Sequence, residues 1–167
     1  MLRHLLSILL LPFLVVVIVP YWLLNHFAAS DTRWANGLLI AWLPRAAGAI
    51  SIICGLALFI WCVNLFARVG KGTLAPWDPT RKLVAVGPYR FVRNPMIIGV
   101  GLMLIGQDLF RGSWVVGAWA CVFVLINHIY FVLSEEQGLE KRFGEAYRVY
   151  KINVPRWIPR LKPWPGE

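Results

Sequence analysis

Residues Gly112–Ser134 read GSWVVGAWACVFVLINHIYFVLS, a run of 23 residues without a charged side chain. A helix of about 20 apolar residues is long enough to cross a bilayer core about 30 Å thick. Two further uncharged runs, Leu5–Leu24 and Ala46–Ala67, have 20 and 22 residues, and a shorter one, Asn94–Gln107, has 14. These runs predict an all-α fold, a polytopic membrane helix bundle of four to five transmembrane helices.

The composition of the whole chain supports this class. Of the 167 residues, 59% are hydrophobic and 15% are charged, against roughly 45–50% and about 25% in soluble domains. These values exclude a disordered chain, a collagen and a soluble globular domain. The polar segments between the runs are too short for a separate soluble domain, so we expect residues 1–167 to form a single integral membrane domain.

Two segments leave the number of spans open. At about 1.5 Å per residue, the run Asn94–Gln107 reaches only about 21 Å. We therefore expect that Asp108–Phe110 lengthens it or that the bilayer thins around it. The segment Trp34–Pro44 is a candidate fifth membrane segment, which would invert the N-terminus. Pro12 and Pro20 should kink the first span mildly.

The distribution of positive charge predicts the orientation. With four spans, alternate loops carry 14 and 3 of the Lys and Arg residues, and the richer side faces the cytoplasm. Both termini and the loop of residues 68–93 are therefore expected to be cytoplasmic, with the first span acting as a signal anchor. The basic segments are short and tethered to the membrane, so we expect contacts with membrane lipids and none with nucleic acid.

The residues that usually bind metals or dinucleotides do not form a recognisable pattern. Cys54, Cys62 and Cys121 lie in different parts of the predicted spans, where a free cysteine usually packs as a small apolar residue. The sequence has no zinc-ligand spacing, so we expect no metal. Gly99-Val100-Gly101 lacks the third glycine of a dinucleotide fingerprint and lies in a membrane run, which excludes a Rossmann site.

The polar segment of residues 70–95 does not have the sequence of a simple connector. Its prolines forbid a continuous helix; they are Pro76, Pro79, Pro88 and Pro95. Asp78-Pro79 favours a turn, and Leu83–Val86 is predicted to be a short extended piece. The segment ends with Arg90, Arg93 and Asn94 at the mouth of a span.

A second polar segment follows the run Gly112–Ser134. It has apolar residues at helical spacing; they are Leu139, Phe143, Tyr147 and Tyr150. This pattern predicts a cytoplasmic amphipathic C-terminal helix that ends at Val154-Pro155. An interfacial helix whose polar face is simply solvated fits the same pattern.

Glu135 and Glu136 lie where this span leaves the membrane. Paired carboxylates at that depth are costly unless they meet a partner. Phe131 and His128 lie one and two turns earlier, and Asn127 is next to His128. Polar residues within an apolar span are candidates for function, although a structural hydrogen bond to a neighbouring helix is an equal alternative.

The two polar segments together resemble a known family. Arg93–Gly99, preceded by Gly87–Val92, resembles the Arg-His-Pro-x-Tyr-x-Gly motif of the isoprenylcysteine carboxyl methyltransferases and the related phospholipid N-methyltransferases. The segment from Glu135 to Arg156 is similar to their second motif. Gly72–Thr80 looks like the bacterial branch of the family. The resemblance covers about residues 68–160, which would be the catalytic half of the domain.

The resemblance implies a methyltransferase of the bacterial inner membrane that uses S-adenosyl-L-methionine. The implied cofactor-binding residues are Arg81, Lys82, Leu83, Val84, Tyr89, Asn94, Pro95, Met96, Ile97, Glu135 and Glu136. A carboxylate such as Glu135 suits the amino and ribose hydroxyl groups of this cofactor. Arg93 and Asn94 carry donors that suit its carboxylate. The acceptor would be membrane-embedded or amphiphilic, with a prenylcysteine-like carboxylate or a lipid headgroup, and would enter from the bilayer.

Three residues depart from the family pattern. Asn94 replaces the motif His, and Ile97 replaces the motif Tyr. Phe131 stands where the carboxyl methyltransferases carry an Arg associated with the substrate carboxylate. A substrate carboxylate would therefore need another cation, such as Arg90 or Arg93.

We expect Arg93 and His128 to be catalytic residues, with His128 as a proton acceptor. The expected substrate-binding residues are Arg90, Asn127 and Phe131. Two alternatives are an NADPH-dependent membrane enzyme similar to the sterol reductases and a non-catalytic membrane scaffold. The adjacent carboxylates favour the methyltransferase, because they would repel the 2′-phosphate of NADPH.

Overall fold

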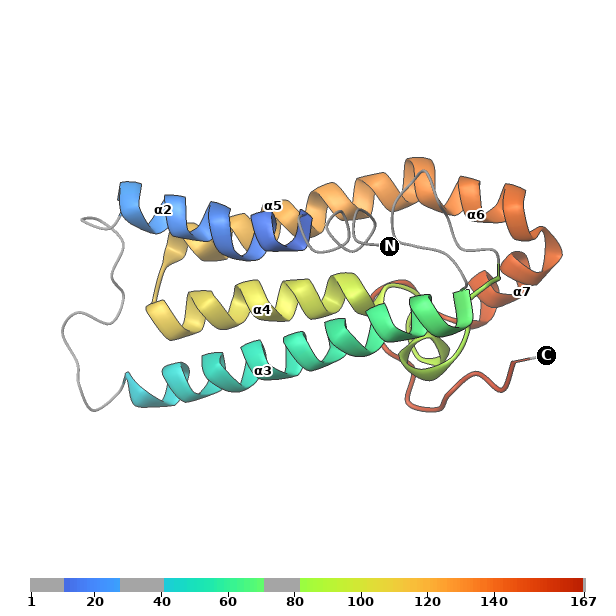
Figure 1. The fold of residues 1–167 in the computed structure, drawn as a ribbon, viewed down its shortest axis with the longest axis horizontal. Coiled ribbons are helices and arrows are strands. Elements are labelled where there is room, and N and C mark those ends of the chain that lie inside the picture. Colours follow the sequence, from blue (N-terminus) through green and yellow to red (C-terminus); the bar gives the residue numbers. More distant parts are fainter. Residues whose placement is uncertain (1–10, 28–40, 71–81, 167) are drawn as a thin grey trace. The chain divides into compact units, whose positions relative to one another are not determined.

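The computed structural model describes residues 11–27, 41–70 and 82–166, and in these ranges it contains helices and no β-strand, as predicted (Figure 1). The N-terminal helix consists of a π-helical segment η1 (Leu14–Ile18) and α2 (Val19–Phe27). The remaining elements are α3 (Trp42–Leu65), η3 (Phe66–Gly70), η4 (Gly87–Arg90), α4 (Pro95–Arg111), α5 (Trp114–Tyr130), η5 (Phe131–Glu135), α6 (Glu136–Phe143) and α7 (Glu145–Asn153).

Two continuous helices are long and apolar enough to cross a membrane. They are Trp42–Gly70, with 29 residues, and Trp114–Phe143, with 30. The helix Leu11–Phe27 is apolar but shorter. Helix α4 has 17 residues and ends at Arg111, so Asp108–Phe110 does lengthen the third run. The number of spans and the orientation of the termini stay predictions.

Several expectations fall outside the described residues. They concern the turn at Asp78-Pro79, the cofactor residue Arg81 and the part of the candidate fifth segment before Ala41. The end of that candidate segment, Trp42–Pro44, is the first turn of α3.

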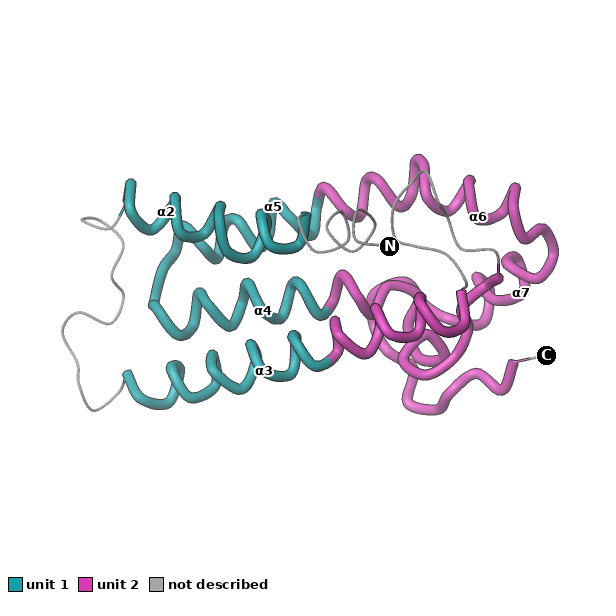
Figure 2. The backbone as a smooth tube through the Cα atoms, viewed as in Figure 1, with its two compact units in different colours: residues 1–57, 99–125 teal, residues 58–98, 126–167 magenta. Residues whose placement is uncertain are grey.

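The chain divides into two compact units (Figure 2). Unit 1 consists of residues 1–57 and 99–125, and unit 2 of residues 58–98 and 126–167. Helices α3, α4 and α5 each contribute residues to both units. Both predicted motifs lie in unit 2, apart from Gly99 at the end of the first.

In unit 1, glycines let α3 and α4 approach closely. A Cβ atom on Gly48 would lie 2.6 Å from the carbonyl oxygen of Gly106, and one on Gly106 would lie 2.7 Å from that of Gly48. A Cβ on Gly55 would lie 2.5 Å from the carbonyl oxygen of Gly99. Small residues at such positions are typical of helix pairs that pack inside a membrane.

The N-terminal helix adapts to Pro20 with the π-helical segment η1. Proline has no N–H, so the carbonyl group of Val16 loses its helical partner at Pro20. The side chain of Gln107 donates a hydrogen bond to this carbonyl oxygen at 2.9 Å. Trp119 Nε1 donates to the neighbouring carbonyl oxygen of Val15 at 3.0 Å. The expected perturbation at Pro20 is thus accommodated by side-chain donors of unit 1.

The predicted C-terminal amphipathic helix is two helices, so the prediction of one continuous helix was wrong. Gly144 separates α6 from α7 with φ of 55° and ψ of −127°, a conformation that glycine adopts far more readily than other residues. The apolar face still forms a cluster across this break, because Leu139 and Phe143 pack against Tyr147 and Tyr150. Helix α7 ends before Val154, as predicted.

Substituting Gly106→Ala should destabilise the packing of α3 on α4 by about 1–3 kcal/mol, the usual cost of overpacking. The new Cβ would meet the backbone of Gly48 at 2.7 Å and that of Ile52 at 2.9 Å. Gly101→Ala on the same helix is the control, because nothing lies within 4 Å of its Cβ position. The midpoint of thermal unfolding in detergent measures both. Equal midpoints for the two variants would contradict the close packing.

Candidate functional site

A carboxylate at the start of α6 binds three cations in unit 2. Glu136 Oε1 accepts hydrogen bonds from Arg93 Nη1 at 2.8 Å and from Arg156 Nε at 2.7 Å. Lys151 Nζ lies 3.3 Å from Glu136 Oε2. The side chains of Glu136 and Arg93 are only 7% and 11% exposed. We call these four residues the Glu136 cluster.

The Glu136 cluster joins the two predicted motifs. Arg93 lies in the first motif, directly before α4, and Glu136 lies in the second. The ion pair between them spans 43 positions of the chain. A buried carboxylate is costly unless it is paired and hydrogen-bonded, and here three cations meet that need. Glu136 is therefore saturated by residues of the chain itself.

Tyr147, on α7, lies next to the Glu136 cluster. Burial raises the pKa of its hydroxyl, and the negative charge of Glu136 raises it further. A hydrogen bond with Arg93 acts in the opposite direction. The net effect is a raised pKa, so Tyr147 stays neutral and can share the donors of Arg93 without adding a second negative charge.

The C-terminal tail, residues 154–166, runs along the first motif. Arg93 donates its backbone N–H to the carbonyl oxygen of Pro155 at 2.9 Å, and Arg160 donates to that of Phe91 at 2.9 Å. Trp164 donates to the carbonyl oxygen of Arg90 at 2.9 Å, and Arg90 Nε donates to that of Trp164 at 2.6 Å. These bonds satisfy a backbone segment that belongs to no long helix.

Tyr89 and Tyr150 are buried side chains in the core of unit 2. The hydroxyl of Tyr150 donates a buried hydrogen bond to the carbonyl oxygen of Tyr89 at 2.7 Å. Tyr89 itself is 6% exposed and packs in one cluster with Cys62 and Val84. Burial raises the pKa of both tyrosines above the ordinary value of 10. Tyr89 thus lies in the core of unit 2, with its ring away from solvent.

His128 and Phe131 both contact the tail. Trp157 Nε1 donates a hydrogen bond to His128 Nδ1 at 3.0 Å. The ring of Phe131 meets the ring of Trp157 edge-on, with centroids 6.3 Å apart. In a neutral imidazole with Nδ1 as acceptor, the proton is on Nε2. In this tautomer, the lone pair of His128 Nδ1 accepts the hydrogen bond from Trp157.

The other predicted residues have diverse positions in unit 2. Leu83 packs against the cluster of Tyr147, Tyr150 and Val154. Met96 packs against the cluster that contains Tyr89. Val84 and Pro95 are buried, whereas Lys82 is exposed. The half-buried set consists of Arg90, Asn94, Ile97, Asn127 and Glu135.

Two donors and one carboxylate in these motifs stand out by their environment. Asn94 Nδ2 and Arg93 Nε are buried and have no hydrogen-bond partner. Glu135 lies outside the Glu136 cluster and accepts a hydrogen bond from the hydroxyl of Tyr130 at 3.3 Å. Buried donors without a partner are rare in proteins and need an explanation, such as a ligand.

The sequence did not predict the contribution of the tail. Arg156 closes the second motif, but nothing in its spacing indicates that it binds Glu136. Lys151, Trp157 and Trp164 had no predicted function. In the described part of the chain, no group of three or more His, Cys, Asp or Glu residues could hold a metal ion.

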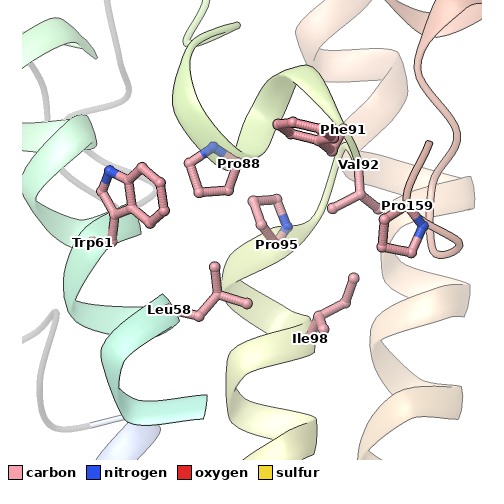
Figure 3. Close-up of a pocket in the computed structure, with 8 residues that line it drawn as sticks. All are labelled: Leu58, Trp61, Pro88, Phe91, Val92, Pro95, Ile98 and Pro159. Carbon is pink, nitrogen blue, oxygen red and sulfur yellow. The ribbon is translucent and has the colours of Figure 1, made fainter. Parts of the chain in front are cut away.

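An apolar groove of about 240 Å³ lies beside the first motif (Figure 3). Leu58 and Trp61 of α3 form one wall, and Pro159 of the tail contributes another. The remaining lining residues come from the first motif, namely Pro88, Phe91, Val92, Pro95 and Ile98. Every lining side chain is apolar, and nothing in the sequence pattern predicted this groove.

Comparison with known proteins identifies the family. The family profile described as "Phospholipid methyltransferase" matches residues 43–146, which is more than half of the chain. The chain belongs to the phospholipid methyltransferase family. The match begins in α3 and ends in α7, so it includes the first motif and the ion pair between Arg93 and Glu136. The resemblance drawn from the two motifs is confirmed.

Two curated relatives of this phospholipid methyltransferase family member illustrate how far the similarity extends. An uncharacterized protein of Haemophilus influenzae is 32% identical over 63 residues, which are 38% of this chain and 100% of that protein. The protein-S-isoprenylcysteine O-methyltransferase of Schizosaccharomyces pombe is 30% identical over 82 residues, which are 47% of this chain and 34% of that enzyme. The match thus covers only about a third of the yeast enzyme. No solved structure matches this chain significantly.

Removing the central carboxylate of this family member should destabilise unit 2. Glu136→Gln leaves Arg93 and Arg156 without their charged partner, and breaking a buried pair in this way costs about 3–5 kcal/mol. Glu140→Gln on the same helix is the control. Glu140 pairs with Arg148, and their side chains are 34% and 59% exposed, so water screens this pair and its loss should cost little stability. Chemical unfolding in detergent compares the two, and equal losses would contradict the assignment of Glu136 as the structural carboxylate.

The buried Tyr150 of this family member should make its stability sensitive to alkaline pH. Its pKa is raised by burial in the folded protein but is near 10 in the unfolded chain. As the pH rises, the unfolded chain loses this proton first, so the free energy of unfolding falls above about pH 10.

The Tyr150→Phe variant separates two effects. At neutral pH it should be less stable by about 1–3 kcal/mol, because the Tyr89 carbonyl loses its buried donor. Between about pH 9 and about pH 11, its unfolding midpoint should fall less than that of the unmodified protein. Tyr21→Phe, at an exposed position, is the control. An equal alkaline fall in all three proteins would show that Tyr150 titrates freely.

Proposed function

We propose that the protein is an integral membrane methyltransferase that uses S-adenosyl-L-methionine and acts on an amphiphilic acceptor. The observation that carries this proposal is the ion pair of Arg93 with Glu136, because it joins the two motifs that resemble the membrane methyltransferases. Asn94 and Glu135 are the chain neighbours of this pair. Membership of the phospholipid methyltransferase family also supports methyl transfer.

The residues around the ion pair fit the chemistry of this cofactor. Asn94 Nδ2 and Arg93 Nε are buried donors without a partner, which suits the carboxylate of the cofactor's amino-acid part. Glu135 lies outside the Glu136 cluster and can accept from amino or ribose hydroxyl groups. When bound, S-adenosyl-L-methionine supplies a methyl group on a positively charged sulfur atom.

Glu135 and Glu136 therefore have different tasks in this proposal. Glu136 holds the tail and the first motif together, and Glu135 contacts the cofactor. Methyl transfer at a sulfonium needs mainly alignment of the reacting groups and a dry site. Tyr89, Val84 and Met96 contribute to that by forming the apolar core that holds the first motif, rather than by direct polar contact.

The acceptor end is built from Arg90, Arg93 and the wall near Phe131. Phe131 and His128 both contact Trp157, so we assign them to holding the tail, and we do not assign a proton-accepting step to His128. A prenylcysteine-like carboxylate or a lipid headgroup would then meet Arg90 or Arg93. The isoprenylcysteine acceptor named for the yeast relative is one candidate for this chain.

The proposed location is the bacterial inner membrane, with both termini in the cytoplasm. The asymmetric distribution of Lys and Arg supports this orientation. In that arrangement the soluble cofactor reaches the first motif from the cytoplasm, and the acceptor arrives through the bilayer.

Isothermal titration of the purified protein in detergent tests the proposal. We expect binding of S-adenosyl-L-methionine and of S-adenosylhomocysteine. Glu135→Ala should weaken both by about 10- to 100-fold, because a hydrogen bond to a charged group is worth about 1.5–3 kcal/mol. Glu140→Ala should bind like the unmodified protein.

Three other results would contradict parts of this proposal. Binding of NADPH without S-adenosyl-L-methionine would favour the reductase, and binding of neither would favour a non-catalytic scaffold. Equal affinities of the Glu135→Ala and Glu140→Ala variants would remove Glu135 from the cofactor site.

A further inference from the structure

The apolar groove beside the first motif is unsuited to the cofactor. Its eight lining side chains are all apolar, whereas the cofactor carries an amino group, a carboxylate and a sulfonium that need polar partners. Its volume of about 240 Å³ is also below the range of about 300–1,000 Å³ that is usual for whole small-molecule ligands. The groove therefore fits part of an apolar molecule.

The size of the groove matches a segment of aliphatic chain. A volume of about 240 Å³ has room for several methylene groups, because one water molecule takes roughly 30 Å³ in the liquid. Such a segment has no polar atoms to satisfy, which agrees with the absence of polar side chains from the lining.

The groove lies at an apolar surface of unit 2. Trp61 is 55% exposed, and its neighbour Ile60 is 50% exposed. Both belong to the helix Trp42–Gly70, which is long and apolar enough to cross a membrane. Exposed apolar side chains on such a helix face lipid tails, so a membrane lipid can enter the groove without crossing water.

Two arginines follow residues that line the groove. Phe91 and Val92 line the groove, and Arg93 follows them directly. Pro159 lines it from the tail, and Arg160 follows. Arg93 is paired with Glu136 and its Nε is assigned to the cofactor, whereas Arg160 Nη1 is buried and has no hydrogen-bond partner. The charge next to the groove therefore complements a headgroup that carries acidic or carbonyl oxygens.

We propose that this groove binds an aliphatic chain of the membrane amphiphile that accepts the methyl group. Part of this chain lies between Leu58 and Trp61 on one side and Phe91, Ile98 and Pro159 on the other. The groove thus aligns the headgroup with the first motif and selects acceptors by their chain. This inference rests on the proposed methyltransferase function, but chain binding itself requires neither cofactor nor turnover.

Photolabelling of the full-length protein in lipid nanodiscs tests the groove. The probe is a phosphatidylethanolamine with a diazirine on carbon 6 of one acyl chain, and mass spectrometry locates the label. In the unmodified protein, label should collect on the peptides that contain Phe91–Ile98 and Pro159, and it should saturate as the probe concentration rises.

A groove-filling variant and a matched control decide whether this label reports the groove. Leu58→Trp fills the groove from α3 and should reduce label on Phe91–Ile98 by about tenfold or more, because losing even two buried methylenes removes that much binding. Ile60→Trp places the same side chain on the exposed face of α3 and should leave the label unchanged. Leu58→Phe, a smaller change, provides the same comparison if Leu58→Trp does not fold.

Other outcomes would overturn the proposal. They are label that does not saturate, equal label in Leu58→Trp and Ile60→Trp, displacement of the probe by a ring-shaped quinol but not by a free fatty acid, and cross-linking of the groove to a second protein. Titration with S-adenosyl-L-methionine separates this proposal from the proposed function, because Leu58→Trp should bind the cofactor normally. Cofactor binding without groove labelling would refute only the groove, and the reverse would refute only the methyltransferase.

Discussion

The buried carboxylate of Glu136 is the interaction on which the structure of unit 2 depends. It binds Arg93 of the first motif, Lys151 of α7 and Arg156 of the tail. Residues 87–94 and the tail lie outside the long helices, and α7 has only nine residues, so the packing of long helices does not fix them. A buried charge with three partners fixes their positions instead, because each partner that moved away would leave the carboxylate desolvated and less well paired. The backbone hydrogen bonds between the tail and residues 90–93 then orient the two segments that the ion pairs hold together.

This arrangement explains why two adjacent carboxylates are useful. Consecutive residues of a helix point about 100° apart, so Glu135 and Glu136 cannot both enter the same cluster of cations. Glu136 is saturated by the chain, and Glu135 accepts a hydrogen bond from the hydroxyl of Tyr130. One carboxylate thus supports the fold at the site where the other is available to a ligand.

The sequence predicted those features that depend on local patterns. Uncharged runs predicted the helices, and apolar spacing predicted that Leu139, Phe143, Tyr147 and Tyr150 would share a surface. The break at Gly144 was missed because the spacing of the apolar residues is kept across it, so periodicity alone gives no signal. A glycine within a helical pattern was the available clue.

The contacts of the tail could not be predicted for a different reason. The bond from Arg90 to Trp164 spans 74 positions, and that from Tyr150 to Tyr89 spans 61. Such pairs are set by how helices pack, not by spacing along the chain. The same limit applies to His128, because its chemistry suggested a proton acceptor until the contact with Trp157 gave its basic nitrogen a partner. The site residues that carry the ligand remain predictions.

The prolines of the first motif do more than interrupt helices. Pro88 and Pro95 both line the apolar groove, and Pro159 lines it from the tail. Any other residue type at these positions would carry a backbone N–H, and a donor that faced an apolar chain would be costly without a partner. Proline has no N–H, so backbone can lie against a lipid chain without that cost. Arg93 and Asn94 lie between two of these prolines, Pro88 and Pro95. The same short segment can therefore present a dry surface to a chain and polar groups to a ligand, as alignment of two such different molecules requires.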